Sequence, residues 1–239
     1  MPTAPRSTTP APAPLPPAAP SLTERRKAET QLEIARAAAA LFAERGSAVT
    51  ADDIARSAGV ALRTFYRYFR TKEDAVAPLL AVGVRQWLAD LRRTAAEAEA
   101  AGRSVRDVLE RAARQALTPS DERAAEALRW TRGLLRAMRD DPALRAVWHR
   151  VHHDSEEALI PVLAGLTDGG PAEVRLAAAA ANTAMRVAVE TWAAEGEGDG
   201  EGDGEGEAGD PAELVGRGMR ALTAGLSGLD RRRTAERHA

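Results

Sequence analysis

The sequence predicts an all-α protein, with a small N-terminal domain of three helices followed by a larger helical domain. The composition supports this fold class, because alanine is abundant and only 4% of the residues are aromatic, which suits thin contacts between helices. Apolar residues also recur at helical spacing, as at Ile34, Ala38, Leu41 and Phe42, and no segment alternates as a strand would. We therefore expect about nine helices and no sheet.

The first helix is expected over residues 23–45, with Thr23 as its N-cap and Gly46 at its end. Thr50 then caps a second, short helix, and Asp53 stands three residues later in a capping-box position. Each of these two helices therefore begins with a residue that is common at helix N-caps.

A tight turn and a third helix follow the second helix. Gly59 can take the left-handed backbone conformation that ends the second helix. The third helix is expected over residues 61–68, where Phe65 and Phe69 face inward, four residues apart. Two short helices joined in this way form a helix-turn-helix, whose second helix enters the major groove of DNA in many proteins.

The helical pattern continues to the end of the second domain. Further helices are expected over residues 73–99, 104–117, 120–139, 141–166, 172–194 and 211–229, with Ser120 as the N-cap of the third of these. Residues 1–22 are rich in proline and alanine and are expected to form a disordered tail. Residues 195–210 alternate acids with glycine and predict a flexible linker, and residues 231–239 form a basic C-terminal tail.

The charge is distributed unevenly along the chain. The formal net charge is -2, but eight acids lie between Glu195 and Asp210, whereas ten basic and six acidic residues lie between Ser21 and Lys72. The N-terminal domain is therefore basic, as DNA binding requires. Cysteine is absent, which excludes disulfides and thiolate metal sites. Without a secretory signal or a long apolar run, we expect a soluble, cytoplasmic protein.

The segment TADDIARSAGVALRTFYRYFRTKEDAV, over residues 50–76, resembles the DNA-binding domain of the TetR family. That family shows the pattern T…IA…AGV…T-[FLY]-Y-x-[HY]-F-x-[ST]-K-E-[DE]. Ala61 departs from it, because the family often has a capping serine there. The matching residues are Thr50, Ile54, Ala55, Ala58, Gly59, Val60, Thr64, Phe65, Tyr66, Tyr68, Phe69, Thr71, Lys72, Glu73 and Asp74.

The resemblance implies a DNA-binding domain over residues 23–72 and an effector-binding and dimerisation domain over residues 73–230. It implies that Tyr66, Tyr68 and Lys72 contact phosphates and that Thr50 lies near the DNA backbone. Base reading then falls to Leu62, Arg63 and Thr64, because these side chains can reach base edges. The expected DNA contacts are Thr50, Leu62, Arg63, Thr64, Tyr66, Arg67, Tyr68 and Lys72.

One reading helix spans few base pairs, so we expect a homodimer on a palindromic operator. The helices over residues 172–194 and 211–229 are the predicted dimer surface, because small residues permit close helix approach. The alternative is that these residues pack only within one chain. They are Ala177, Ala180, Ala181, Ala184, Gly218 and Ala221.

The resemblance also implies a small-molecule effector, bound among the helices of the second domain. Residues 128–192 resemble the acyl-CoA-like ligand-binding type, which implies a hydrophobic or acyl-CoA-like effector. Core packing is the alternative role for the large side chains there. The candidate pocket residues are Trp87, Leu109, Trp130, Leu134, Met138, Trp148 and Leu159.

Three histidines, His149, His152 and His153, stand at helical spacing near Asp154 and Glu156. Such a face could hold a metal ion in a helical metal-dependent enzyme, but an exposed polar face is the interpretation we favour. We expect no cofactor, no metal site and no enzyme activity, because no nucleophile-base pair, HExxH motif or phosphate-binding glycine loop is present. The predicted function is a ligand-responsive transcriptional repressor. An architectural DNA-binding protein without effector is the alternative.

Overall fold

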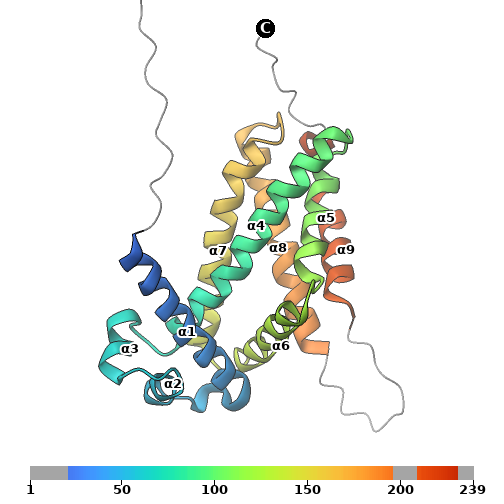
Figure 1. Cartoon of the computed structure of the whole chain (residues 1–239). Helices are drawn as coiled ribbons and strands as arrows, with labels where there is room; N and C mark the ends of the chain where they lie inside the picture. Colours follow the sequence, from blue (N-terminus) through green and yellow to red (C-terminus); the bar gives the residue numbers. More distant parts are fainter. Residues whose placement is uncertain (1–20, 196–208, 231–239) are drawn as a thin grey trace, which may run out of the picture.

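The computed structural model describes residues 21–195 and 209–230, and every regular element in these ranges is a helix (Figure 1). The predicted all-α fold is thereby confirmed for this part of the chain. The predicted tail over residues 1–22, the acidic linker and the basic C-terminal tail lie largely or wholly outside the described residues. No helix in the described ranges is both long and apolar enough to cross a lipid bilayer.

Helix α1 (Leu22–Arg45) begins slightly earlier than the sequence predicts. Its N-cap is Ser21, which forms a capping box with Glu24, so the prediction of Thr23 as N-cap was wrong. Gly46 ends the helix, as predicted, and a 3₁₀ turn, η1 (Gly46–Ala48), follows it.

The N-terminal domain is completed by α2 (Ala51–Ser57) and α3 (Leu62–Tyr68). Side chains from all three helices meet in its interior, where Phe42, Ile54 and Phe65 are fully buried. Burial of such side chains contributes about 1.5–3 kcal/mol each. The short helices α2 and α3 are therefore held by the long helix α1.

The larger domain starts with a 3₁₀ turn, η2 (Glu73–Val76), where the sequence predicts helix from residue 73. The helices that follow are α4 (Ala77–Ala100), α5 (Val105–Leu117), α6 (Glu122–Ala137), α7 (Pro142–Ala164), α8 (Pro171–Ala194) and α9 (Pro211–Thr223), and η4 (Ser227–Asp230) ends the described chain. Asp121 caps α6 by accepting the N–H of Ala124 at 2.8 Å, so the predicted cap at Ser120 was wrong.

Helix α9 is shorter than predicted, because the sequence pattern suggests helix as far as Leu229. It ends at Thr223, whose hydroxyl donates to the carbonyl of Met219 at 2.7 Å. The separate turn η4 then brings Leu229 into the core, where it is fully buried.

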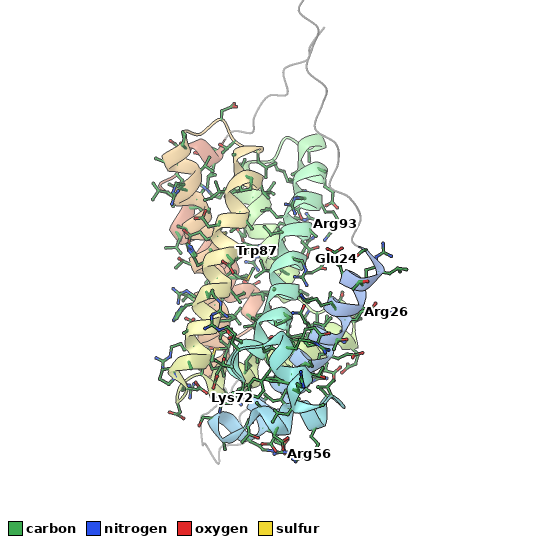
Figure 2. All side chains as sticks on the ribbon, turned by 90° about the vertical axis from the view of Figure 1, so that its left-hand side faces the viewer. Glu24, Arg26, Arg56, Lys72, Trp87 and Arg93 are labelled. Carbon is green, nitrogen blue, oxygen red and sulfur yellow. The ribbon has the colours of Figure 1, made fainter. Side chains whose placement is uncertain are left out.

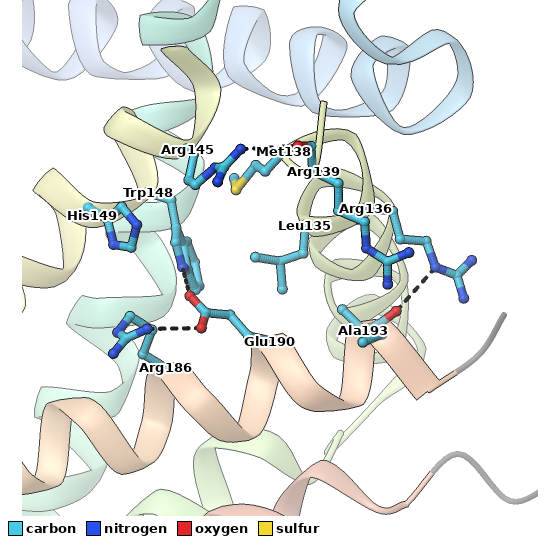
Figure 3. A pocket seen from close by; sticks show the side chains of 11 residues that line it. Leu135, Arg136, Met138, Arg139, Arg145, Trp148, His149, Arg186, Glu190 and Ala193 are labelled. Carbon is cyan, nitrogen blue, oxygen red and sulfur yellow. Dashed lines mark hydrogen bonds and ion pairs between the residues drawn. The ribbon is translucent and has the colours of Figure 1, made fainter. Parts of the chain in front are cut away.

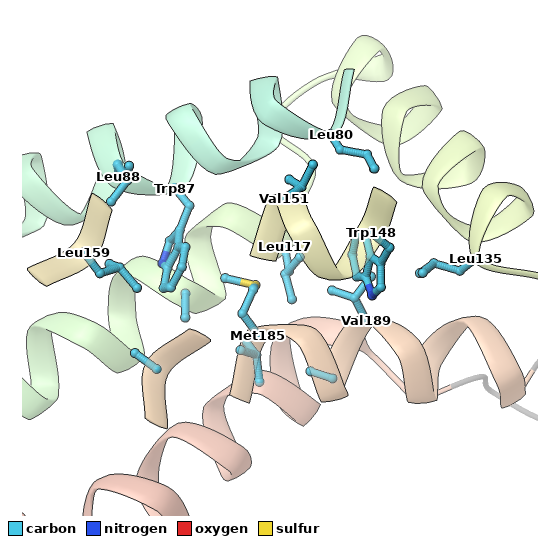
Figure 4. Close-up of a cluster of buried hydrophobic side chains, with 14 of the residues drawn as sticks. Leu80, Trp87, Leu88, Leu117, Leu135, Trp148, Val151, Leu159, Met185 and Val189 are labelled. Carbon is cyan, nitrogen blue, oxygen red and sulfur yellow. The ribbon is translucent and has the colours of Figure 1, made fainter. Parts of the chain in front are cut away.

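Helices α4, α5, α7, α8 and α9 run along the length of the larger domain, and α6 lies across its lower end beside α1 (Figure 1). Its interior holds Trp87, Leu159 and Met185, which lie close together in Figure 4. The two domains touch where α6 crosses α1. This approach is so close that a Cβ added at Gly133 would lie 2.5 Å from the Cβ of Ala43.

The small residues of α8 and α9 pack these two helices against each other within one chain. Ala177, Ala181 and Ala184 are buried, and a Cβ added at Gly218 would stand 3.5 Å from the Cβ of Ala184. The prediction that this stripe forms the contact between protomers was therefore wrong for its buried members. The physical reason is that α9 packs on α8 within the chain, and this contact also needs small residues so that the two helices can approach closely.

Candidate nucleic-acid interface

The start of α2 is fixed by a complete capping box. The hydroxyl of Thr50 accepts the N–H of Asp53 at 3.1 Å, and the N–H of Thr50 donates to the Asp53 carboxylate at 3.0 Å. The Thr50 hydroxyl also donates to this carboxylate at 2.6 Å, and these bonds from Thr50 lower the pKa of Asp53. Thr50 is a predicted DNA contact, but its hydroxyl proton is directed to Asp53.

The turn between α2 and α3 is closed by two backbone hydrogen bonds. The N–H of Gly59 donates to the carbonyl of Arg56 at 3.1 Å, and the N–H of Val60 donates to the carbonyl of Ala55 at 2.9 Å. This is a Schellman motif, and Gly59 has the positive φ of 67° that such a motif needs. The predicted turn is confirmed, and it fixes where α3 starts.

Helix α3 has one inward and one outward face, as predicted. Phe65 and Phe69 are buried, whereas Leu62 is 38% exposed and Tyr66 is 56% exposed. Arg63 and Arg67 are also exposed, and Thr64 and Tyr68 are half-buried. The outward face therefore offers apolar, hydroxyl and guanidinium groups to a neighbouring molecule.

One further contact shapes this face. The guanidinium of Arg67 lies 5.1 Å from the centre of the Tyr68 ring, which orients both side chains. Ala61 supplies no side-chain cap to α3, as its alanine side chain implies. Figure 2 shows Arg56 and Lys72 at the lower end of the molecule, with the N-terminal domain.

Lys72, predicted to contact phosphate, is held by the protein itself. Its Nζ donates to the carbonyls of Ser47 and Val49 at 2.7 and 2.8 Å, and it lies 5.7 Å from the centre of the Phe42 ring. Lys72 therefore ties the end of α3 to the segment before α2. The sequence could not indicate this role, because backbone carbonyls leave no side-chain signature.

A pocket of about 290 Å³ lies between α6, α7 and α8 (Figure 3). Two of the seven predicted pocket residues, Met138 and Trp148, line it. Trp130 is half-buried on α6 and does not line the pocket. The other four belong to the packed core and do not line it either, because their large apolar side chains fill the space between helices: Trp87, Leu109, Leu134 and Leu159.

Sequence reasoning missed the charged residues of this pocket, among them Arg145, Arg186 and Glu190. The Glu190 carboxylate accepts hydrogen bonds from Trp148 Nε1 at 2.7 Å and from Arg186 Nη1 at 2.9 Å. The four-residue spacing of Arg186 and Glu190 on one helix is the signal that could have suggested their pairing.

The three histidines of α7 do not share one exposed face, contrary to the interpretation from the sequence. His149 and His153 are exposed, but His152 is buried, and its Nδ1 lies 3.2 Å from the Oδ1 of Asn182. Burial lowers the pKa of His152 to about 4. Within the described ranges, no three histidine or acidic side chains are placed to hold a metal ion together.

The fold and this site define the class of protein: a helix-turn-helix domain whose reading helix is exposed, joined to a larger helical domain. Residues 34–77 match the family model described as bacterial regulatory proteins, tetR family. None of the curated proteins compared with the chain matches it.

Several solved structures resemble most of the chain. The fatty acid degradation regulator FadR from Bacillus halodurans is 20% identical, with a TM-score of 0.53 over 83% of this chain and 97% of that chain. FadR from Thermus thermophilus, a TetR-family repressor in complex with lauroyl-CoA, is 27% identical, with a TM-score of 0.46 over 82% and 94%. A TetR-family regulator from Streptomyces coelicolor is 17% identical, with a TM-score of 0.48 over 82% and 79%.

Residues 34–77 are thus similar to the DNA-binding region of the tetR family, and the likeness to the Bacillus halodurans structure shows that the fold is shared. The resemblance stated from residues 50–76 is thereby confirmed.

Proposed function

We propose that the protein is a homodimeric, ligand-responsive repressor that binds a palindromic operator through two copies of α3. The single observation that carries this proposal is the outward face of α3, which is held by Phe65 and Phe69 and stays open to solvent. A helix presented in this way fits the major groove, which is about 12 Å wide.

In this proposal Leu62, Arg63 and Thr64 read bases, because they stand in the first turn of α3. The Arg63 guanidinium can donate two hydrogen bonds to one guanine, and such a pair discriminates by about 1–3 kcal/mol. Tyr66, Arg67 and Tyr68 would contact phosphates and fix the register.

Thr50 and Lys72 have a structural role within the DNA-binding domain. Their hydrogen bonds to Asp53 and to the carbonyls of Ser47 and Val49 orient the helix-turn-helix. Contact of either side chain with a phosphate remains a prediction that comes from the family resemblance.

Exposed apolar side chains on α8 and α9 support a dimer. Leu176 and Val187 of α8 are 59% and 46% exposed, and Leu222 of α9 is 46% exposed. Leu176 and Val187 are eleven residues apart, which is close to three helical turns, so they share one face. A second copy of the chain would cover this outward face, whereas the small buried residues hold α8 to α9 within each chain.

A ligand response is supported by the position of the pocket. The pocket lies partly on α7, and α7 also reaches the segment that follows α3 through the ion pair between Arg150 and Asp74. Movement of α7 on ligand binding would therefore reach the DNA-binding domain. An acyl-CoA-like effector and the repressor role are expectations that rest on resemblance.

Fluorescence anisotropy with duplex DNA from upstream of the gene tests the proposal. We expect tight, salt-sensitive binding to a palindrome and weak binding to an isolated half-site. The double substitution Leu176→Glu, Val187→Glu should give monomers in analytical ultracentrifugation and weaken palindrome binding. The matched control Val82→Glu changes an exposed valine of α4 and should leave the dimer intact. Equal binding of palindrome and half-site would contradict the proposed dimer.

A further inference from the structure

Helix α6 carries a glycine at the point where it crosses α1. Gly133 lies well inside α6, where glycine destabilises a helix relative to alanine. A Cβ added at Gly133 would lie 2.5 Å from the Cβ and 3.3 Å from the Cα of Ala43 on α1. Carbon atoms in ordinary contact are about 3.5–4.0 Å apart. A methyl group at Gly133 would therefore have to move the two helices apart by about 1 Å.

Helix α6 is anchored in the larger domain on both sides of this glycine position along the chain and around the helix. Leu134 and Met138 are buried in the core, and the Nε of Arg136 donates to the carbonyl of Ala193 on α8 at 3.2 Å. In Figure 1, α6 crosses the lower end of the domain beside α1. We therefore take α6 as the support and α1 as the element that yields to an added methyl group.

Ala43 belongs to the DNA-binding domain. The preceding residue, Phe42, is fully buried in the core that also holds Ile54 of α2 and Phe65 of α3. The turn of α1 that meets Gly133 thus also anchors the helix-turn-helix. Ala43 itself is exposed, so the crossing lies at the surface and can widen without opening this core. A shift of α1 at Ala43 carries α3 with it, because the three helices share one core.

The DNA-binding domain meets the larger domain in two places. One is the connection through η2, which packs on α1 and continues into α4. The other is the crossing of α1 and α6. A chain connection by itself lets a domain rotate about it, whereas a second contact fixes the angle. The separation of Gly133 and Ala43 therefore helps to set the direction in which α3 points.

We propose that the contact between Gly133 and Ala43 positions the reading helices of the dimer and thereby sets the half-site spacing that the protein accepts. This inference rests on the proposed function, because only a dimer on a palindrome has a half-site spacing. One inserted base pair separates two half-sites by about 3.4 Å more and rotates them by about 35°. Two reading helices held at a fixed distance and angle lose contacts when the spacing changes. Gly133 and Ala43 act as positioning residues and do not touch DNA.

Fluorescence anisotropy with a series of duplexes tests the inference on the full-length protein. The series keeps both half-sites of the palindrome and changes their separation by one or two base pairs in either direction. We expect the wild type to prefer one separation by about tenfold or more. Gly133→Ala should prefer another separation, or bind all of them within about threefold of one another. Its affinity for an isolated half-site should equal that of the wild type, because α3 is unchanged.

A reciprocal substitution supplies the rescue. In the double variant Gly133→Ala, Ala43→Gly the two Cβ atoms no longer meet and only the 3.3 Å approach to the Cα remains, so the wild-type spacing preference should return. Gly83→Ala adds a methyl group in open space on α4 and should leave this preference unchanged. Circular dichroism melting shows whether each variant folds. If Gly133→Ala unfolds, Ala43→Val tests the same contact from α1, because the stiff valine side chain adds bulk there.

A wild-type spacing preference in folded Gly133→Ala, or no recovery in the double variant, would overturn the inference. An equal loss of affinity for the half-site and for every palindrome would overturn it as well, since that result means a general loss of DNA binding. If the wild type does not prefer a palindrome to a half-site, the proposed dimer fails and the inference fails with it. If the wild type prefers one separation and Gly133→Ala keeps that preference, only the inference fails.

Discussion

Arg150 of α7 donates a 2.7 Å hydrogen bond to the carboxylate of Asp74, which lies in the turn with which the larger domain begins. Asp74 stands in η2, between α3 and α4, so this ion pair joins α7 to the segment that directly follows the DNA-binding domain. The two side chains are 53% and 26% exposed, which limits the contribution of the pair to stability to about 1 kcal/mol or less. We therefore expect the pair to matter mainly for how the helix-turn-helix is oriented relative to the larger domain.

Removing either partner of this pair should alter operator affinity more than stability. We expect Arg150→Gln and Asp74→Asn each to change operator affinity by up to about fivefold, which corresponds to about 1 kcal/mol. The double variant should show no further change, since the pair is already broken. Anisotropy titrations of all four proteins form the cycle, and strictly additive effects would show that the two residues are not coupled.

Lys72→Met should destabilise the N-terminal domain. The substitution leaves the carbonyls of Ser47 and Val49 without their donor. The bond to Ser47 is exposed and the bond to Val49 is part-buried, so we expect a loss of about 1 kcal/mol, at the lower end of the cost of an unsatisfied acceptor. We expect a lower free energy of unfolding in urea. Unchanged stability, together with a salt slope of DNA binding that is smaller by about 0.9, would instead identify Lys72 as a phosphate contact alone.

Gly59→Ala should destabilise the helix-turn-helix by about 1–2 kcal/mol, because an L-residue is strained at its positive φ. A Cβ at this position meets nothing within 4 Å, so the backbone alone causes the loss. Gly83→Ala is the matched control, since Gly83 lies inside α4 and has equally open space. It should stabilise the protein by about 0.5–1 kcal/mol, and thermal melts should show opposite shifts for the two variants.

The buried His152 should make the free energy of unfolding depend on pH. Its folded pKa of about 4 lies below the ordinary value of 6.5, so the unfolded chain takes up the proton first as the pH falls. The stabilising effect is complete above pH 6.5 and is lost between about pH 6.5 and 4, by about 3 kcal/mol at most.

Urea unfolding at fixed protein concentration, compared at about pH 7 and about pH 5, measures this loss. His152→Gln keeps a polar partner for Asn182 and carries no charge at any pH, so it should show a smaller difference between the two conditions. Equal pH dependence in the two proteins would mean that His152 is not the responsible group.

Local signals in the sequence predicted most of the fold. Helix starts at Thr50, Ser104 and Asp141 and the turn at Gly59 are encoded by caps and by backbone preference, and the structure has them. Ser21 is the N-cap of α1 in place of Thr23, and Asp121 is the N-cap of α6 in place of Ser120, because neighbouring polar residues compete for the same role. The exact first residue of a helix is hard to predict, because several residues within one turn have similar capping preferences.

The candidate sites were harder to predict, because their residues act through distant partners. No pattern in the sequence indicates that Lys72 reaches the carbonyls of Ser47 and Val49, or that Arg150 reaches Asp74. Large apolar side chains were expected around the pocket, yet Trp87 and its neighbours fill the core. Helical periodicity identifies the inward face of a helix but does not show where that face leaves a gap.

Selection of bound sequences from a pool of random duplex DNA tests the central claim most directly. We expect the wild-type protein to enrich an inverted repeat, and Arg63→Ala to lose base preference at one symmetric position in each half-site while it still binds. Arg92→Ala should enrich the same repeat as the wild type. Failure of the wild-type protein to enrich any sequence, or an identical repeat selected by Arg63→Ala, would contradict the assignment of α3 as the reading helix.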